Sequence, residues 1–81
     1  MARIKIDGEE FNVVKISTSS NNYEDLEVIT YIECDNDIVI LPTLDMVIEM
    51  EGVDYRMDNK GDVNAFIQSC RTLNILDSLD G

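Results

Sequence analysis

Histidine and tryptophan are absent from this chain of 81 residues, and only six side chains are basic. Without histidine, no Ser/His or Cys/His pair of nucleophile and base exists in the chain. The two cysteines, Cys34 and Cys70, are far fewer than a secreted disulfide scaffold carries, and neither lies in a CxxC motif. We therefore predict two buried, reduced thiols. The four glycines are isolated, so the chain has no phosphate-cradling loop.

Long apolar runs are also absent. No run approaches the roughly 18 residues that a membrane span needs, and the first six residues do not resemble a signal peptide. We expect a soluble, cytoplasmic protein that binds no membrane. The chain is short enough for a single domain, 1–81, with a small core. Burial of apolar surface between two copies would help such a core, so a homodimer and a monomer are both retained as alternatives.

What the chain does contain is 44% hydrophobic residues, the composition of a folded protein. Two segments, 4–13 and 48–57, alternate apolar residues around an acidic residue followed by glycine, which predicts two β-hairpins. We place Gly8 and Gly52 first in type II′ turns or a bulged variant, because the apolar side chains then share one face. The sequence leaves open whether the likeness is an internal duplication. The predicted cross-strand pairs are Ile4 with Val13, Ile6 with Phe11, Ile48 with Met57, and Met50 with Tyr55.

The middle of the chain predicts a loop and further strands. The polar cluster 17–22 is typical of an exposed loop. The segment 27–33 is rich in β-branched and aromatic residues and favours a strand, although a helix remains an alternative for 23–35. A turn is predicted at 35–37. The apolar run 38–41 then suits a central or doubly covered strand that Pro42 ends, with another strand starting near Asp45.

A helix is predicted from Val63 to about Leu73, with Asp62 as its N-cap. Its apolar side chains fall at helical spacing, whereas 75–81 is predicted to be a flexible tail, to extend the helix, or to become ordered on a partner. The fold class is therefore α+β: a small antiparallel sheet or open barrel of about five or six strands, including two glycine-turn hairpins, with one C-terminal helix packed on it. The predicted apolar helix face consists of Val63, Phe66, Ile67, Cys70 and Leu73.

No catalytic, cofactor or metal site is predicted. The segments 35–37 and 58–62 resemble fragments of calcium-binding loops, but neither continues with the spacing of an EF-hand. Turn residues and a helix cap explain both. Cys34 has acidic neighbours that raise the pKa of its thiol, so it is a poor nucleophile. We expect a protein that is not an enzyme.

The strongest signal is charge. Seventeen acidic residues give a formal charge of −11. Such a field repels nucleic acid and anionic membranes and speeds association with basic surfaces, an effect that salt weakens. We expect no direct binding to nucleic acid and a basic protein surface as the partner. The predicted contact residues surround a loop and a turn; they are Glu24, Asp25, Glu27, Glu33, Asp35 and Asp37.

Two functional hypotheses follow. In charge and size, though by no shared motif, the chain resembles the small acidic inhibitors that bacteriophages direct against host nucleic-acid enzymes and defence systems. That resemblance implies an inhibitor whose carboxylates mimic DNA phosphates on a nucleic-acid-binding enzyme or defence complex, in the cytoplasm of a host cell. The alternative is a structural or assembly subunit that associates with copies of itself through β edges, for which we name Ile4–Ile6 and Ile38–Leu41.

Overall fold

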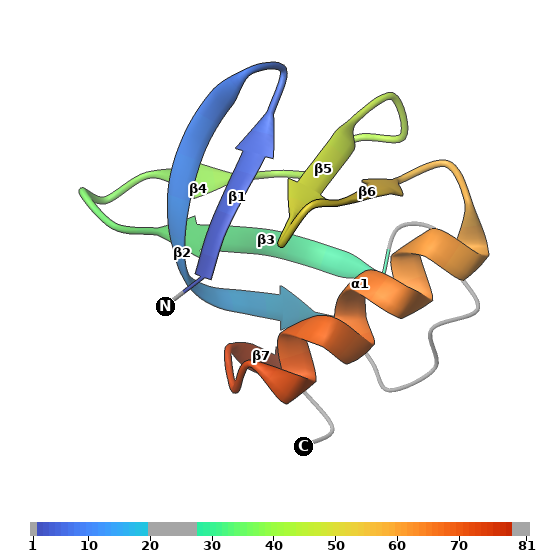
Figure 1. The fold of residues 1–81 in the computed structure, drawn as a ribbon. Helices are drawn as coiled ribbons and strands as arrows, with labels where there is room; N and C mark the ends of the chain where they lie inside the picture. The colour runs from blue at the N-terminus through green and yellow to red at the C-terminus, as the bar shows by residue number, and fades with distance from the viewer. Residues whose placement is uncertain (1, 20–27, 79–81) are drawn as a thin grey trace.

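The computed structural model describes residues 2–19 and 28–78, which form one curved sheet with a single helix packed on it (Figure 1). The α+β prediction is confirmed, and the sheet is not closed into a barrel. The elements in chain order are β1 (Ala2–Ile6), β2 (Glu9–Thr18), β3 (Ile29–Cys34), β4 (Val39–Ile40), β5 (Val47–Met50), β6 (Val53–Arg56), α1 (Lys60–Thr72) and β7 (Leu76–Ser78).

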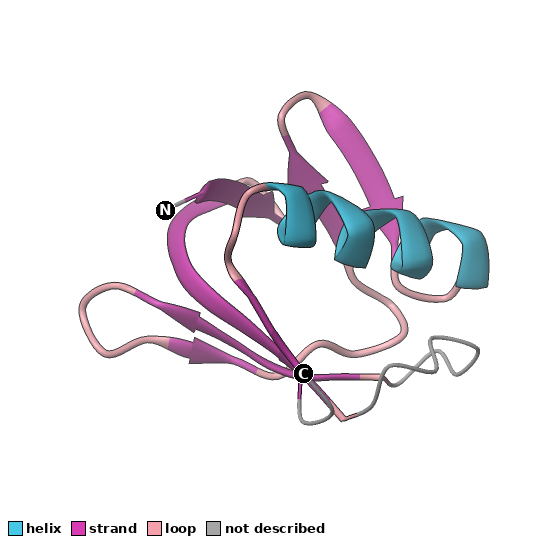
Figure 2. Cartoon of the chain, turned by 90° about the horizontal axis from the view of Figure 1, so that it is seen from below, coloured by secondary structure: helices cyan, strands magenta, loops and turns pink. Residues whose placement is uncertain are grey.

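Within the sheet, the strand order is β4-β3-β2-β1-β5-β6, and β7 pairs in parallel with β2. The long strand β2 therefore joins two arms: its first half pairs with β1 and its second half with β3 and β7. The β2–β3 register shifts between Val13 and Lys15 and again between Ser17 and Thr18. Such irregularities increase local bending. Seen from below, β2 curves between the arms while α1 crosses the open side of the sheet (Figure 2).

Both predicted glycine hairpins form, but the predicted turn register is wrong. Ile6 pairs with Glu9, and Met50 pairs with Val53, so the central turn residues are Asp7-Gly8 and Glu51-Gly52. All four of these residues have positive φ, between 52° and 83°, as a type I′ turn requires. This turn matches the right-handed twist of the strands. The twist outweighs the preference for pairing every apolar residue: Ile6 and Met50 remain buried although their partners, Glu9 and Val53, are exposed.

The corrected register shifts the remaining cross-strand pairs as well. Ile4 pairs with Phe11 rather than Val13, and Ile48 pairs with Tyr55 rather than Met57. The inward alternation survives the shift, since Ile4, Ile48 and Tyr55 are all buried. The core face of each hairpin was thus predicted correctly although its turn was not.

The helix begins three residues before the predicted start. Asn59, not Asp62, is the N-cap: its side-chain oxygen accepts a hydrogen bond from the Asp62 amide at 3.1 Å. Asp62 lies in the first turn instead, where its carboxylate accepts from the Arg56 amide at 3.0 Å and ties the helix to β6. The predicted apolar face is confirmed at Val63, Phe66, Ile67 and Cys70, which are buried, but Leu73 is 37% exposed.

In the middle of the chain, the predicted strand is confirmed as β3, which begins at Ile29. Ser17 and Thr18 belong to β2 and are buried, contrary to the predicted exposed loop. Within the described part of the chain, their hydroxyls have no hydrogen-bond partner. The rest of the predicted loop beyond Ser19, and residues 23–27 of the strand-or-helix alternative, lie outside the described residues.

Two predictions about sheet position are wrong. The run Ile38–Leu41 does not form a central strand: only Val39–Ile40 pair, as β4 at the sheet edge. Conversely, Ile4–Ile6 is not an edge, because β1 pairs with both β2 and β5. Runs of apolar residues do not by themselves distinguish a covered strand from an exposed one. Pro42 does end the run, and β5 lies far from β4 in the strand order, as a separate strand.

After the helix, the chain returns to the sheet. The Ile75 carbonyl accepts from the Ile16 amide at 2.7 Å, and β7 continues beside β2. Ile75 is buried and its amide donates to the Cys70 carbonyl at 3.0 Å, so this part of the predicted tail belongs to the core, while 79–81 lie outside the described residues. Cys34 and Cys70 are both free and buried, as predicted.

Candidate functional site

The β3–β4 hairpin contains all the predicted contact residues that the structure describes. Glu33 lies in β3, Asp35 directly follows the strand, and Asp37 lies in the turn before β4. Three further predicted residues, Glu24, Asp25 and Glu27, lie outside the described residues. We use the name acidic hairpin for residues 33–40. Three of the six predicted contact residues thus lie in one hairpin, and their contact with a partner stays a prediction.

Backbone hydrogen bonds fix the shape of the acidic hairpin. The Cys34 amide donates to the Ile38 carbonyl at 2.8 Å, and the Ile38 amide donates to the Asp35 carbonyl at 3.3 Å. Asn36 and Asp37 both have φ near +60°, a conformation that asparagine and aspartate adopt more readily than most residues. The sequence forms a turn here because these residue types tolerate left-handed backbone.

A second set of contacts attaches the acidic hairpin to β2. Asn12 Nδ2 donates to Asp35 Oδ2 at 3.1 Å, and the Asp35 amide donates to the Asn12 carbonyl at 3.0 Å. The carboxylate of Asp35 is thus half-buried and oriented, whereas Asp37 is exposed. A partner would therefore meet the carboxylate of Asp35 in a fixed orientation and the exposed side chain of Asp37, which can change its rotamer.

Cations do little to neutralise the acidic hairpin. Lys15 lies opposite Glu33 on β2, yet its ammonium pairs with Asp77 at 3.6 Å. The other ion pair between described residues joins Arg56 to Asp58 at 2.9 Å, on the far arm of the sheet. The carboxylates of the acidic hairpin therefore remain available for cations from outside the molecule.

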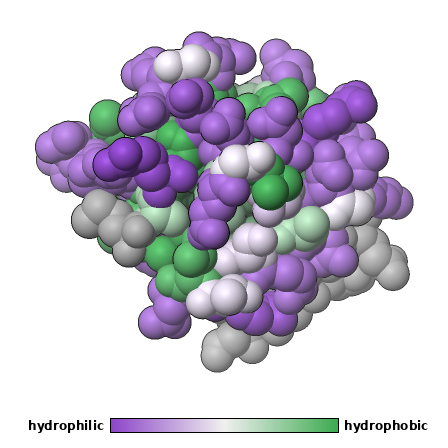
Figure 3. Space-filling model, in the orientation of Figure 1, coloured by the Kyte–Doolittle hydropathy of each residue, from purple (hydrophilic) through white to green (hydrophobic). Residues whose placement is uncertain are grey.

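Exposed apolar side chains accompany these carboxylates. The sequence named this run as an edge only for self-association, and otherwise assigned it to a covered strand. Val39 is 56% exposed and Leu41 is 65% exposed. Val39 lies opposite Glu33, so an apolar and an acidic side chain share one face at the sheet edge. Viewed as in Figure 3, the molecule is mostly hydrophilic, and apolar residues appear in small separate groups.

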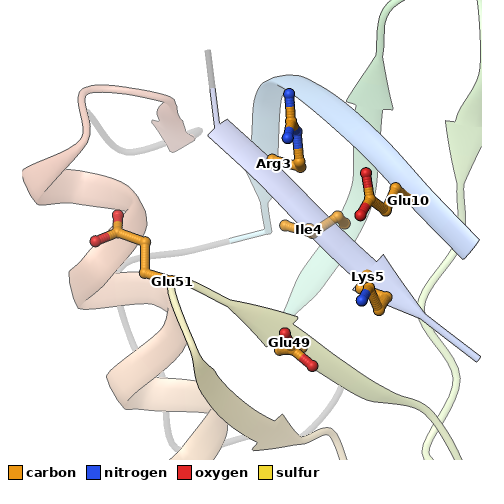
Figure 4. Close-up of a pocket in the computed structure, with 6 residues that line it drawn as sticks. All are labelled: Arg3, Ile4, Lys5, Glu10, Glu49 and Glu51. Atoms are coloured by element: carbon orange, nitrogen blue, oxygen red, sulfur yellow. The ribbon is translucent and has the colours of Figure 1, made fainter. Parts of the chain in front are cut away.

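A second candidate lies on the outer face of the other arm, where a concavity of about 290 Å³ is lined by Arg3, Ile4, Lys5, Glu10, Glu49 and Glu51. Lys5 pairs across the sheet with Glu10 on one side and Glu49 on the other, and Figure 4 shows these side chains on neighbouring strands. Arg3 extends from the same strand, while Glu51 lies toward the helix. Because both signs of charge mix here, this cleft is less suited to a basic surface than the acidic hairpin is.

The titratable groups offer little for catalysis. Burial raises the pKa of the Cys34 thiol, with the charge of Asp35 adding to the effect, as the sequence predicted. Burial raises the pKa of the Cys70 thiol to about 12. Both thiols are therefore protonated near neutral pH and are poor nucleophiles. The pKa of Asp45 is lowered, chiefly because the Thr43 hydroxyl donates to its carboxylate.

Groups of three or more side chains arranged to hold a metal ion are not found among residues 2–19 and 28–78. The same part of the chain contains no helix with the length and apolar character needed to cross a membrane.

Comparisons with models of protein families, with curated proteins and with solved structures find no match for this chain.

Proposed function

We propose that this protein is a small acidic inhibitor that binds a basic, nucleic-acid-binding surface of another protein through the acidic hairpin. The protein would act without catalysis, in the cytoplasm, and in the cytoplasm of the host if it is encoded by a phage. The partner class is a nucleic-acid-binding enzyme or a defence complex. Carboxylates would replace phosphates on the partner, so binding by the protein and by nucleic acid would be mutually exclusive.

One observation carries the proposal: the carboxylates of the acidic hairpin have no cationic partner within 4 Å in the described structure, in a chain of net charge −11. Carboxylates that are already paired would have to break existing contacts before meeting a basic partner. Unpaired ones attract a partner over about 8–10 Å at physiological ionic strength. The backbone contacts of Asp35 with Asn12 limit the ordering that binding would require.

The test is capture of proteins from a cell lysate by the tagged protein, followed by displacement with duplex DNA or with RNA. We expect nucleic-acid-binding proteins to be retained at low salt and released both by moderate salt and by the added nucleic acid. Retention that is indifferent to nucleic acid would contradict the proposal, because competition is its central feature.

Charge reversal then locates the surface. The double variant Glu33→Lys/Asp37→Lys should lose the captured proteins. The matched control Glu9→Lys/Asp54→Lys changes the net charge equally at exposed positions on the other arm of the sheet and should retain most of them. Equal losses from both variants would show that net charge alone, and not the acidic hairpin, governs binding.

The exposed edge strand β4 favours a second candidate function, assembly with copies of the same chain. An edge with exposed apolar side chains can pair with another strand. Sedimentation at several protein concentrations separates the two: a stable oligomer of the pure protein supports assembly, whereas a monomer that captures basic proteins supports inhibition. The homodimer retained above is tested by the same experiment.

A further inference from the structure

We propose that the free edge of β4 takes an extended segment of the partner, one in which basic and apolar residues alternate, as an added strand of the sheet. This inference rests on the proposed function and specifies how the partner is held. The evidence lies in three features of the acidic hairpin: the direction of its backbone groups, the exposure of its apolar side chains, and the position of its charges.

The backbone of β4 has hydrogen-bonding groups that face away from the sheet. Because the Cys34 amide donates to the Ile38 carbonyl, the polar groups of Ile38 face β3. Backbone groups alternate sides along a strand, so the N–H and C=O of Val39 face outward, and those of Ile40 face β3. A strand added beside β4 would pair with Val39.

Apolar side chains lie next to this edge. Val39 and Leu41 are more than half exposed, and Ile38 is 40% exposed, whereas Ile40 packs against the core. Edge strands of monomeric proteins are commonly protected by charged side chains or by short length. Here the strand is short and Pro42 follows it, but the side chains at the edge are apolar. An occupant with apolar residues would remove this surface from water.

The charges identify the occupant. Lys15, Glu33 and Val39 lie side by side on the neighbouring strands β2, β3 and β4. A strand added beside β4 would lie two strand spacings, roughly 10 Å, from β3. A lysine or arginine on that strand can lay its aliphatic stem over Val39 and bring its charge toward Glu33. Asp37, at the turn, would meet a second basic residue of the same segment.

A second copy of this chain fits the edge less well. It would bring another −11 of charge to the interface and would leave the carboxylates of both acidic hairpins without cations. A basic segment instead supplies the missing cations. Charge complementarity therefore favours a different protein over self-pairing at the same edge.

The probe for this inference is a ten-residue peptide in which valine and arginine alternate, compared with the same peptide N-methylated at every backbone amide. The methylated peptide keeps the charge but cannot donate hydrogen bonds from its backbone. Binding to the isotopically labelled protein is followed by backbone amide NMR shifts. We expect the unmodified peptide to shift amides of residues 33–41 and to bind at least about fivefold more tightly than the methylated one.

Variants test the edge and the charges separately. Val39→Pro removes the outward donor without removing a bond to β3 and should weaken peptide binding at least about fivefold, whereas Val39→Thr should bind nearly as well. Glu33→Gln/Asp37→Asn should weaken binding about two- to fivefold per charge. The matched control Glu9→Gln/Asp54→Asn should have a smaller effect.

Several outcomes would overturn the edge site. These are equal binding of both peptides, insensitivity to Val39→Pro in a variant whose NMR spectrum shows that it is folded, and self-association of the pure protein that Val39→Pro abolishes. If the peptide binds by charge alone, the edge site fails while the acidic inhibitor proposal stands. If the peptide binds at β4 but nucleic acid displaces no captured protein, the inhibitor proposal fails and the edge site stands.

Discussion

Alkaline pH should destabilise the protein through the thiol of Cys70. This side chain is fully buried, and burial raises its pKa from 9.0 to about 12. In the unfolded chain the thiol ionises near its ordinary pKa, so the unfolded state loses a proton that the folded state keeps. The stability contributed by the protonated thiol is thus fully present below pH 9 and is lost progressively between pH 9 and 12.

The size of the effect follows from these two pKa values. Between pH 8 and pH 10 the ionisation of Cys70 in the unfolded state should lower the free energy of unfolding by about 1.4 kcal/mol. The Cys34 thiol acts in the same direction, since its pKa is also raised. The comparison therefore uses a Cys34→Ala background, with and without Cys70→Ala.

The assay is urea denaturation at pH 8, 9 and 10, monitored by circular dichroism. Every other side chain is identical in the two variants, so its contribution to the pH dependence cancels in the difference. We expect the free energy of unfolding to fall with pH more steeply when Cys70 is present. Parallel pH profiles for the two variants would refute the reasoning, because they would mean that the thiol ionises as easily in the folded state as in the unfolded one.

Three further predictions concern stability and are checked by the same denaturation assay. Phe66→Ala should cost about 3–5 kcal/mol because the ring is fully buried and lies 5.4 Å from the Tyr55 ring, whereas Leu73→Ala, at a partly exposed position, should cost less than about 1 kcal/mol. Glu51→Asn should stabilise the protein by a few tenths of a kcal/mol, since asparagine favours the positive φ of 55° in the type I′ turn; a loss of stability would contradict the turn assignment. Asn59→Ala should cost about 0.5–2 kcal/mol through loss of the helix cap, and an unchanged denaturation midpoint would mean that the cap contributes nothing.

The sequence predicted the fold class and the core because both depend on the spacing of apolar residues. Alternation in the two hairpins and helical spacing at Val63, Phe66, Ile67 and Cys70 specify which side chains face inward. That information survives an error in turn type or helix start. The errors at Gly8, Gly52 and Asp62 concern local backbone geometry. Strand twist determines the turn type at the two glycines, and competition between Asn59 and Asp62 determines which residue caps the helix.

Position within the sheet could not be predicted in the same way. The run Ile38–Leu41 is more apolar than β1, yet β4 lies at the edge and β1 lies in the middle. Strand order depends on which pairings the whole chain can satisfy together, and no single segment encodes it. The candidate site was therefore only partly visible: the carboxylates of the turn were predicted as contacts, whereas the apolar run beside them was named both as a covered strand and as an edge for self-association.

The parallel pairing of β7 with β2 affects how the protein folds. Ile16 and Leu76 are neighbours in the sheet although about 60 residues separate them in the chain. Contacts of such sequence separation form slowly, because a large loop must close before they stabilise anything. Until β7 pairs with β2, the amide of Ile16 lacks its partner, the Ile75 carbonyl, and the edge of the second half of β2 is unpaired. A chain in which β7 has not yet paired therefore exposes this edge to other chains in addition to the edge strands of the native sheet.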